Sequence, residues 1–274
     1  MEKCSVLIRL KSFILLALLL STNLSSISAQ ETSEKGKKPE KQTKSQKAEA
    51  ARNPTAEQVA ESVILIYGNR ANLNQIRKTT VERGKISVVN AEGKTEQANY
   101  GRFILRADNL EKERIRFDQE FPNAKYDLIF NNNKIFGLYN DAVFAPREDA
   151  SKAFENQIWH GLEALLRYKE NESKIELAGN EKLSSVDFYR LDVTDKQNRK
   201  TRFFISTKQL RVMMLEYTDG DTKYRRKFYD YNYAQSTLVP YRSVLWANDK
   251  QVEETQIQTV SFGQKIEEDA FQAS

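Results

Sequence analysis

Residues 187–194 (Asp-Phe-Tyr-Arg-Leu-Asp-Val-Thr) and 223–231 (Lys-Tyr-Arg-Arg-Lys-Phe-Tyr-Asp-Tyr) belong to the stretch that decides the fold, which runs from 186 to 262. This stretch is rich in aromatic and β-branched residues, and turn clusters such as Asp219-Gly-Asp221 divide it. Both features predict an antiparallel meander without helices. A sheet of this length has to curve or close in order to protect its edges.

The sequence before the meander predicts a helix, a first set of strands and a second helix. Thr55 and Gln58 form a capping box that starts a helix over 56–67, and Gly68-Asn69 ends it. Apolar residues at helical spacing predict the second helix over 147–168. Alternating patterns predict strands at 79–89, 97–107, 112–121, 126–130 and 134–139, and six or seven more follow from residue 175. The fold class is therefore mainly β with α: a half-open antiparallel β-barrel of about 11 strands covered by a few helices.

The N-terminus has the order of a secretory signal peptide. Lys3, Arg9 and Lys11 precede an apolar run at 13–20, and small residues lead to Ser28-Ala29. The run is shorter than the roughly 20 residues that a membrane-spanning helix needs. We expect residues 1–29 to be removed and the protein to be exported to the periplasm.

The single cysteine, Cys4, lies before the apolar run, so it is not a lipidated residue at the cleavage point. The chain after residue 29 contains no cysteine. Disulfides, thiolate metal sites and a cysteine nucleophile are excluded in that part.

Charge separates a tether from the folded part. Residues 30–53 hold lysine clusters and no large apolar residue, which predicts a disordered charged tether. The first 52 residues hold ten of the 43 basic and five of the 38 acidic residues, which leaves 33 of each in 53–274. A single domain over 54–274 thus has no net charge, and a nucleic-acid partner is not expected.

Candidate catalytic groups are few. The only histidine, His160, lies in the apolar pattern of the second helix and is interpreted as a packing or surface residue and not as a general base. A glycosidase needs two facing carboxylates, and those in strands have basic neighbours such as Arg190 and Lys227, as in ion pairs. The carboxylates considered are Asp187, Asp192, Glu216 and Asp230. We expect no enzyme, no cofactor and no metal site.

The second meander resembles the periplasmic outer-membrane lipoprotein carrier (LolA-like) superfamily, the outer membrane lipoprotein-sorting type. The resemblance rests on the strand pairs at 186–193 and 201–206 and the strand at 210–217. It also rests on Tyr-Asp-Tyr at 229–231 and the Val-Pro pair at 239–240 that starts the next strand. Both predicted helices lie where that family has its lid helices.

The resemblance implies an apolar barrel cavity that receives the acyl chains of lipoproteins on their way to the outer membrane. Arg83 is the candidate for the early-strand arginine that latches the lid in those carriers. Some relatives instead bind a regulator protein. The sequence therefore favours a lipid carrier and leaves open a regulatory or scaffold protein and an envelope-polymer hydrolase.

Six apolar residues are predicted to line the cavity or carry its lid, and affinity should rise by about 0.8 kcal/mol per buried methylene. They are Ile64, Phe103, Leu105, Ile115, Phe117 and Trp159. The expected partners are lipid or lipoprotein acyl chains and membrane partner proteins, and we expect a monomer.

Overall fold

The computed structural model describes residues 54–90, 92–140 and 142–272. Within them, one antiparallel sheet has 13 strands in the order β6-β5-β4-β3-β2-β1-β13-β12-β11-β10-β9-β8-β7. The first set is β1 (Thr79–Val89), β2 (Thr95–Leu105), β3 (Arg114–Phe121), β4 (Ala124–Asn131), β5 (Lys134–Tyr139) and β6 (Ala142–Phe144). The second set is β7 (Lys174–Leu183), β8 (Val186–Thr194), β9 (Lys200–Ser206), β10 (Val212–Asp219), β11 (Thr222–Ala234), β12 (Thr237–Ala247) and β13 (Lys250–Phe262). The predicted signal peptide (1–29) and tether (30–53) lie outside the described residues.

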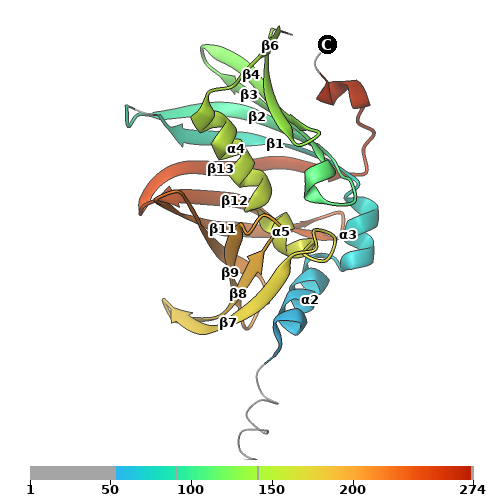
Figure 1. Ribbon diagram of the computed structural model, residues 1–274, viewed down its shortest axis with the longest axis vertical. Coiled ribbons are helices and arrows are strands. Elements are labelled where there is room, and N and C mark those ends of the chain that lie inside the picture. The colour runs from blue at the N-terminus through green and yellow to red at the C-terminus, as the bar shows by residue number, and fades with distance from the viewer. Residues whose placement is uncertain (1–53, 91, 141, 273–274) are drawn as a thin grey trace, which may run out of the picture. The chain divides into compact units, whose positions relative to one another are not determined.

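The sheet is open, with β6 and β7 at its two edges (Figure 1). Within each set, every strand pairs with the next strand in sequence, and among the described residues the two sets join only where β1 pairs with β13. Gly84 allows this join, because a Cβ there would lie 2.1 Å from the carbonyl oxygen of Gln256. The predicted mainly-β antiparallel class is confirmed. The strand count of 13 exceeds the expected 11, and one of the two extra strands is β6, whose three residues are too few for a recognisable alternation.

Two-residue turns fix the register of several hairpins. Asn132-Asn133 and Asn248-Asp249 have positive φ at both positions, as type I′ turns require. Ser184-Ser185 and Gln235-Ser236 have the same pair of positive φ values without asparagine or glycine. The sequence signals the first two turns by residue type, and the other two only by the strands around them.

The first helix, α2 (Ala56–Tyr67), begins and ends where the sequence predicts. The backbone N–H of Gln58 donates to Thr55 Oγ1 (3.2 Å), and that of Thr55 donates to Gln58 Oε1 (2.9 Å). A second helix, α3 (Arg70–Ile76), follows at once and is not predicted. Asn69 has a φ of 60° and accepts from the N–H of Asn72, so the residue expected to end one helix also caps the next.

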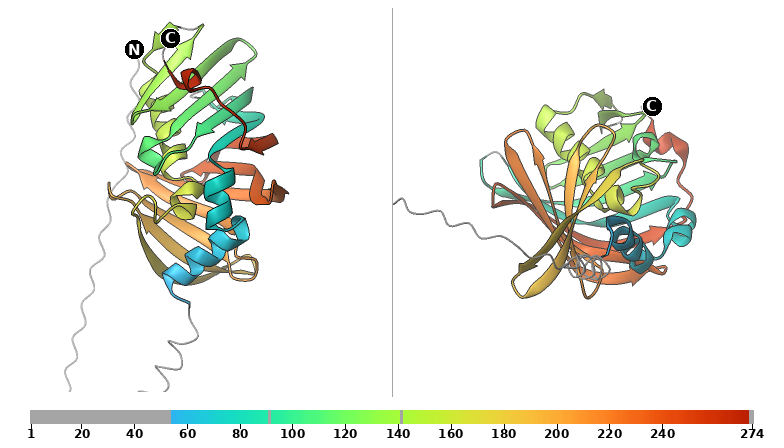
Figure 2. Two further views of the ribbon diagram at one scale, coloured as in Figure 1. Left: turned by 90° about the vertical axis from the view of Figure 1, so that its right-hand side faces the viewer. Right: turned by 60° about the horizontal axis from the view of Figure 1, so that its bottom comes forward.

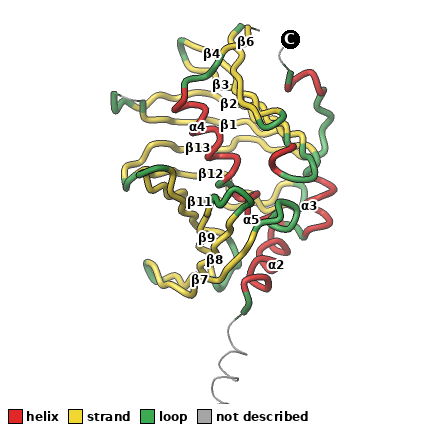
Figure 3. Tube along the Cα trace, in the orientation of Figure 1, coloured by secondary structure: helices red, strands yellow, loops and turns green. Residues whose placement is uncertain are grey.

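The helix predicted over 147–168 is two helices, α4 (Glu148–Trp159) and α5 (Leu162–Leu166). His160 and Gly161 separate them, and Gly161 brings its Cα close to the Gln157 carbonyl. A Cβ at residue 161 would lie 2.8 Å from that oxygen. Short 3₁₀ turns, η1 (Leu110–Lys112) and η2 (Glu268–Phe271), complete the described elements, shown by type in Figure 3.

The helices α2, α4 and α5 cover one face of the curved sheet, which we call the inner face (Figure 2). Helices α2 and α5 pack on β7–β12 in the α2 cluster, which includes Val63, Ile64 and Phe203. Helix α4 packs on β1–β5 in the α4 cluster, which includes Phe117 and Phe154. The C-terminal segment with η2 covers the opposite, outer face, where Phe271 is fully buried. The inner face therefore carries two apolar clusters, each under its own helix.

Candidate functional site

A cavity of about 210 Å³ lies between α4, α5 and the inner face of the sheet. We call it the inner cavity. Strands β2, β3, β11, β12 and β13 and both helices contribute to its apolar wall. The apolar side chains include Ile104, Ile115, Phe154, Ile158, Leu162 and Phe228. The cavity is smaller than the roughly 300–1,000 Å³ of typical ligand pockets.

The other wall of the inner cavity is charged. Arg106 Nη1 lies 3.1 Å from Glu113 Oε1 and 3.0 Å from Glu163 Oε2. Arg77 Nη2 lies 2.6 Å from Glu163 Oε1, and Arg167 donates to Glu113. These five residues form the buried charge cluster, which lies where β1, β2 and α5 meet. In this cluster burial favours the neutral form of each side chain, whereas the neighbouring opposite charges favour the charged form. The distances between the side chains decide which effect is larger.

The two glutamates of the buried charge cluster respond differently. Burial alone would raise the pKa of Glu163, but Arg106 and Arg77 lower it to about 2. Burial raises the pKa of Glu113 despite Arg106 and Arg167, because this side chain is only 1% exposed. Burial also lowers the pKa of Arg77. Attraction to the arginines thus outweighs burial at Glu163 but not at Glu113.

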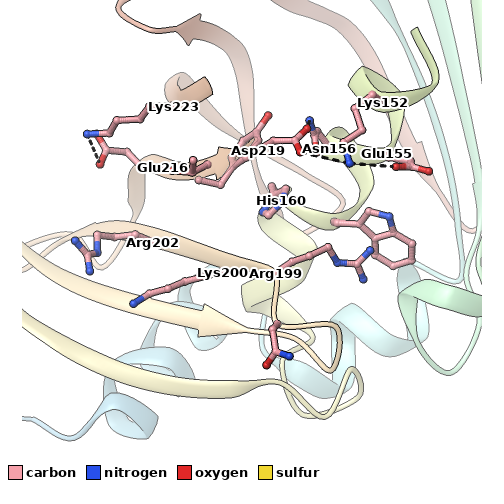
Figure 4. A pocket seen from close by; sticks show the side chains of 14 residues that line it. Lys152, Glu155, Asn156, His160, Arg199, Lys200, Arg202, Glu216, Asp219 and Lys223 are labelled. Atoms are coloured by element: carbon pink, nitrogen blue, oxygen red, sulfur yellow. Dashed lines mark hydrogen bonds and ion pairs between the residues drawn. The ribbon is translucent and has the colours of Figure 1, made fainter. Parts of the chain in front are cut away.

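A larger, polar hollow of about 590 Å³ opens beside the inner cavity between α4 and strands β9–β10. We call it the outer cleft. Figure 4 shows His160 near its centre, with Lys200 and Arg202 from β9 and Glu216 and Asp219 from β10 around it. Glu216 lies 2.8 Å from Arg225, and Asp219 lies 3.4 Å from Lys152. Ion pairs across strands and helix therefore shape this cleft.

Three side chains line both hollows: Asn156, His160 and Tyr217. Asn156 of α4 donates to Asp219 Oδ2 of β10 (2.8 Å). The His160 ring stacks on Tyr217 at 4.1 Å with an interplanar angle of 1°. These residues form a partition between the outer cleft and the inner cavity, and the partition belongs partly to α4.

His160 is a buried part of the partition, so of the two interpretations, packing or surface residue, the structure shows the packing one. It is 6% exposed, and its Nδ1 lies 2.7 Å from Thr201 Oγ1. Burial, helped by Arg199, lowers the pKa of His160 to about 4. The imidazole is therefore neutral at pH 7. Within the described residues no group of three or more histidine, aspartate or glutamate side chains could hold a metal ion.

Helix α4 is held over the inner cavity by several polar contacts. Arg102 Nη2 donates to Gln157 Oε1 (2.7 Å), and Gln157 Nε2 donates to Glu253 Oε2 (3.3 Å). At its C-terminal end, the Arg199 guanidinium lies 4.0 Å from the centre of the Trp159 ring. Arg102 thus latches α4 to β2, whereas the candidate Arg83 is exposed in a hollow with Phe103 and Asp118. The expectation for Arg83 is corrected, because the strand alternation turns it to the outer face.

The six predicted cavity residues do not lie together. Ile115 lines the inner cavity, Trp159 lines the outer cleft, and Phe117 packs on Phe154 of α4. Ile64 is buried in the α2 cluster. Phe103 and Leu105 pack in the outer cluster beneath η2, so their placement on the concave face with Ile115 and Phe117 is corrected. The register pairs Phe103 with Arg116 and Ile104 with Ile115, which assigns them to opposite faces.

The wrong assignment of faces on β2 also explains why the sequence did not predict the charged wall. On β2 the inward residues include Arg102 and Ile104, while Phe103 and Leu105 point outward. Alternation assigns apolar residues to the inside, so it selects the wrong set here. The sequence signal for this wall is Arg102-x-Ile104-x-Arg106. Residues two apart in a strand lie on the same face, so the two arginines share a face with Ile104.

Two of the four carboxylates considered for hydrolysis, Asp192 and Glu216, take part in ion pairs. Asp192 lies 2.7 Å from Arg202 Nε, and the Lys200 ammonium is close on its other side. These partners differ from the sequence neighbours named above, and Asp192 is buried, not exposed. Although burial would raise the pKa of Asp192, Arg202 and Lys200 lower it. No ion pair of Asp187 or Asp230 is found among the described residues.

The fold matches that of known proteins, although the sequence does not. No protein-family model and no curated protein match the chain. A LolA superfamily protein from Nitrosomonas europaea has a similar structure, with a TM-score of 0.59 and 12% identity over 80% of this chain and 98% of that chain. A DUF1329 family protein from Desulfovibrio piger is similar with a TM-score of 0.57 and 11% identity over the same shares. The chain thus has the LolA-like fold that the resemblance predicted.

None of the helices in the described part of the chain is long and apolar enough to cross a bilayer.

Proposed function

We propose that this protein is an exported, non-enzymatic carrier that holds the apolar chain of a lipid or lipoprotein between α4 and the inner face of the sheet. The observation that carries the proposal is the inner cavity, which has an apolar wall and lies under a helix that is held by polar contacts as well as by apolar packing. Residues 1–29 would direct export to the periplasm and residues 30–53 would serve as a tether.

Binding requires α4 to move, because the inner cavity is smaller than an ordinary ligand pocket. Helix α4 has no side-chain hydrogen bond at its N-cap, Arg147, and the break at Gly161 separates it from α5. These two ends are the natural hinge points. Displacement of α4 would expose Phe117 to an incoming chain, since Phe154 of α4 stacks on that ring at 6.0 Å.

The energy of binding would come from apolar burial. Each methylene removed from water contributes about 0.8 kcal/mol, so affinity should rise with chain length until the space under α4 is filled. A carrier of this kind has to release its ligand, and the hydrogen bonds re-formed by Asn156 and Gln157 would favour closure after release.

Native mass spectrometry with organic extraction tests the proposal on protein expressed from the full-length coding sequence and purified from the periplasm. We expect co-purifying lipid or acylated peptide. Two adjacent, partly buried residues of β2 supply a matched pair: Ile104 lines the inner cavity and Leu105 packs on the outer face. Ile104→Gln should lose most of the bound lipid, and Leu105→Gln should retain it.

A clean ligand-free mass, together with no binding of a fluorescent fatty acid, would contradict the proposal. The space under α4 would then be a filled core, and a protein partner would become the better candidate ligand.

A further inference from the structure

The buried charge cluster carries more positive than negative charge. It holds three arginines (Arg77, Arg106 and Arg167) and two glutamates (Glu113 and Glu163), a formal excess of one positive charge. The side chain of Arg106 is only 8% exposed. A buried charge without a counter-charge is strongly unfavourable, so this excess needs an explanation.

Other charges that line the inner cavity are balanced. Arg226 pairs with Glu253 at 2.8 Å, and Arg102 lies 3.6 Å from Glu82. The excess is therefore local to the end of the cavity formed by β1, β2 and α5, and it is not a general property of the inner face.

The same end of the cavity has buried donors without acceptors. Arg106 Nε and Nη2, Arg77 Nε and Thr80 Oγ1 have no hydrogen-bond partner among the described residues. All three residues line the inner cavity. Water can accept hydrogen bonds from such groups, but it cannot neutralise the excess charge. An anion satisfies both requirements at once, and the planar arginine fork matches a carboxylate or phosphate.

We infer that the inner cavity binds an amphiphile with an anionic head group, a carboxylate or a phosphate, seated against Arg106, Arg77 and Thr80. The chain of the amphiphile would lie along Ile104 and Ile115 towards α4. This inference rests on the proposed function and adds the class of ligand. The apolar wall that faces the arginines favours an amphiphile over a free anion, because a small anion would leave that wall without contacts.

Isothermal titration calorimetry on delipidated full-length protein tests the inference with four probes: decanoate, decyl phosphate, decanol and inorganic phosphate. We expect both anionic amphiphiles to bind at least about tenfold more tightly than decanol, as charge-assisted hydrogen bonds predict. Arg106→Gln should remove most of this preference. Arg242→Gln is the matched control, since Arg242 lies on the other face of the sheet from the cavity residue Ser243 and pairs with Glu254.

A second variant covers the case in which Arg106→Gln does not fold. Thr80→Asp places a carboxylate where the inference puts the ligand's head group, so it should raise the unfolding temperature and reduce the preference for anionic probes. An undiminished preference in Thr80→Asp would overturn the assignment of this end of the cavity.

The probes separate the inference from the proposed function. Equal binding of decanol and decanoate would overturn the anionic head group and leave the carrier intact. If decanoate, decyl phosphate and decanol all fail to bind, both the anionic head group and the carrier function are overturned. If inorganic phosphate binds as tightly as decyl phosphate, the ligand is a free anion and the proposal of an amphiphile is overturned.

Discussion

Helices α2 and α4 have 12 residues each and cover the same face of one sheet, but they are held in different ways. Helix α2 has a complete capping box and buries Val63, Ile64 and Tyr67 almost fully. Helix α4 has no side-chain cap at its start, and its buried residues include the polar Asn156 beside the apolar Phe154, Ile158 and Trp159. Apolar burial is non-directional and is lost only when the core opens, whereas a few hydrogen bonds can be exchanged for water. Under the proposed function, α2 is the fixed wall and α4 is the lid that has to move.

The largest expected difference is in core stability. Ile64→Ala in α2 should lower the free energy of unfolding by about 4 kcal/mol, since the side chain is 1% exposed within a filled cluster. Ile158→Ala in α4 should cost only about 2 kcal/mol, because that side chain already borders the inner cavity. Urea denaturation of both variants measures the difference. Equal losses would mean that α4 is as much a part of the core as α2.

Acid should destabilise the α4 end through His160, its C-cap residue. Burial lowers the pKa of His160 from 6.5 to about 4. Above pH 6.5 the imidazole is neutral in both states. As the pH falls towards 4, the unfolded chain takes up a proton that the folded chain refuses, so stability falls by up to about 3 kcal/mol.

His160→Gln should flatten this pH dependence, measured as the free energy of unfolding between pH 4 and 7. Burial and Asp118 raise the pKa of Asp127 to about 6, and this aspartate makes the opposite contribution as the pH falls. The difference between wild type and His160→Gln cancels that contribution. An unchanged slope in the variant would show that His160 is protonated without opening the partition.

The smallest effect on stability, and the most specific for the lid, should come from Arg102. Arg102→Met removes the hydrogen bond to Gln157 of α4, at a cost of about 1 kcal/mol. We expect release of a bound fluorescent fatty acid to become several-fold faster, as followed by stopped flow. Arg114→Met is the control, since Arg114 is in the same half of the sheet and pairs with the exposed Glu268. If both variants change the release rate equally, Arg102 does not act as a latch on α4.

Much of the fold follows from local patterns. The capping box predicts α2 at its observed bounds, and alternation predicts β1 and β5 at theirs. Local rules fail where one residue has two roles, as Asn69 has between α2 and α3. They also fail at Gly161, because the apolar period continues across the break between α4 and α5.

The candidate site was less predictable than the fold, because its inward residues are partly charged. Arg106 and Arg77 are inside because Glu113 and Glu163 are inside with them, and Glu163 is far from both arginines in sequence. Leu105 is outside because the C-terminal segment with Phe271 supplies a second apolar layer. Neither fact is visible in the alternation of a single strand.

Hydrogen exchange followed by mass spectrometry, with and without decanoate, tests the lid and the wall most directly. We predict that the amides of α4 exchange faster than those of α2 in the free protein, and that decanoate slows exchange in α4 while leaving α2 unchanged. Equal exchange of the two helices, with no response to decanoate in α4, would contradict the account.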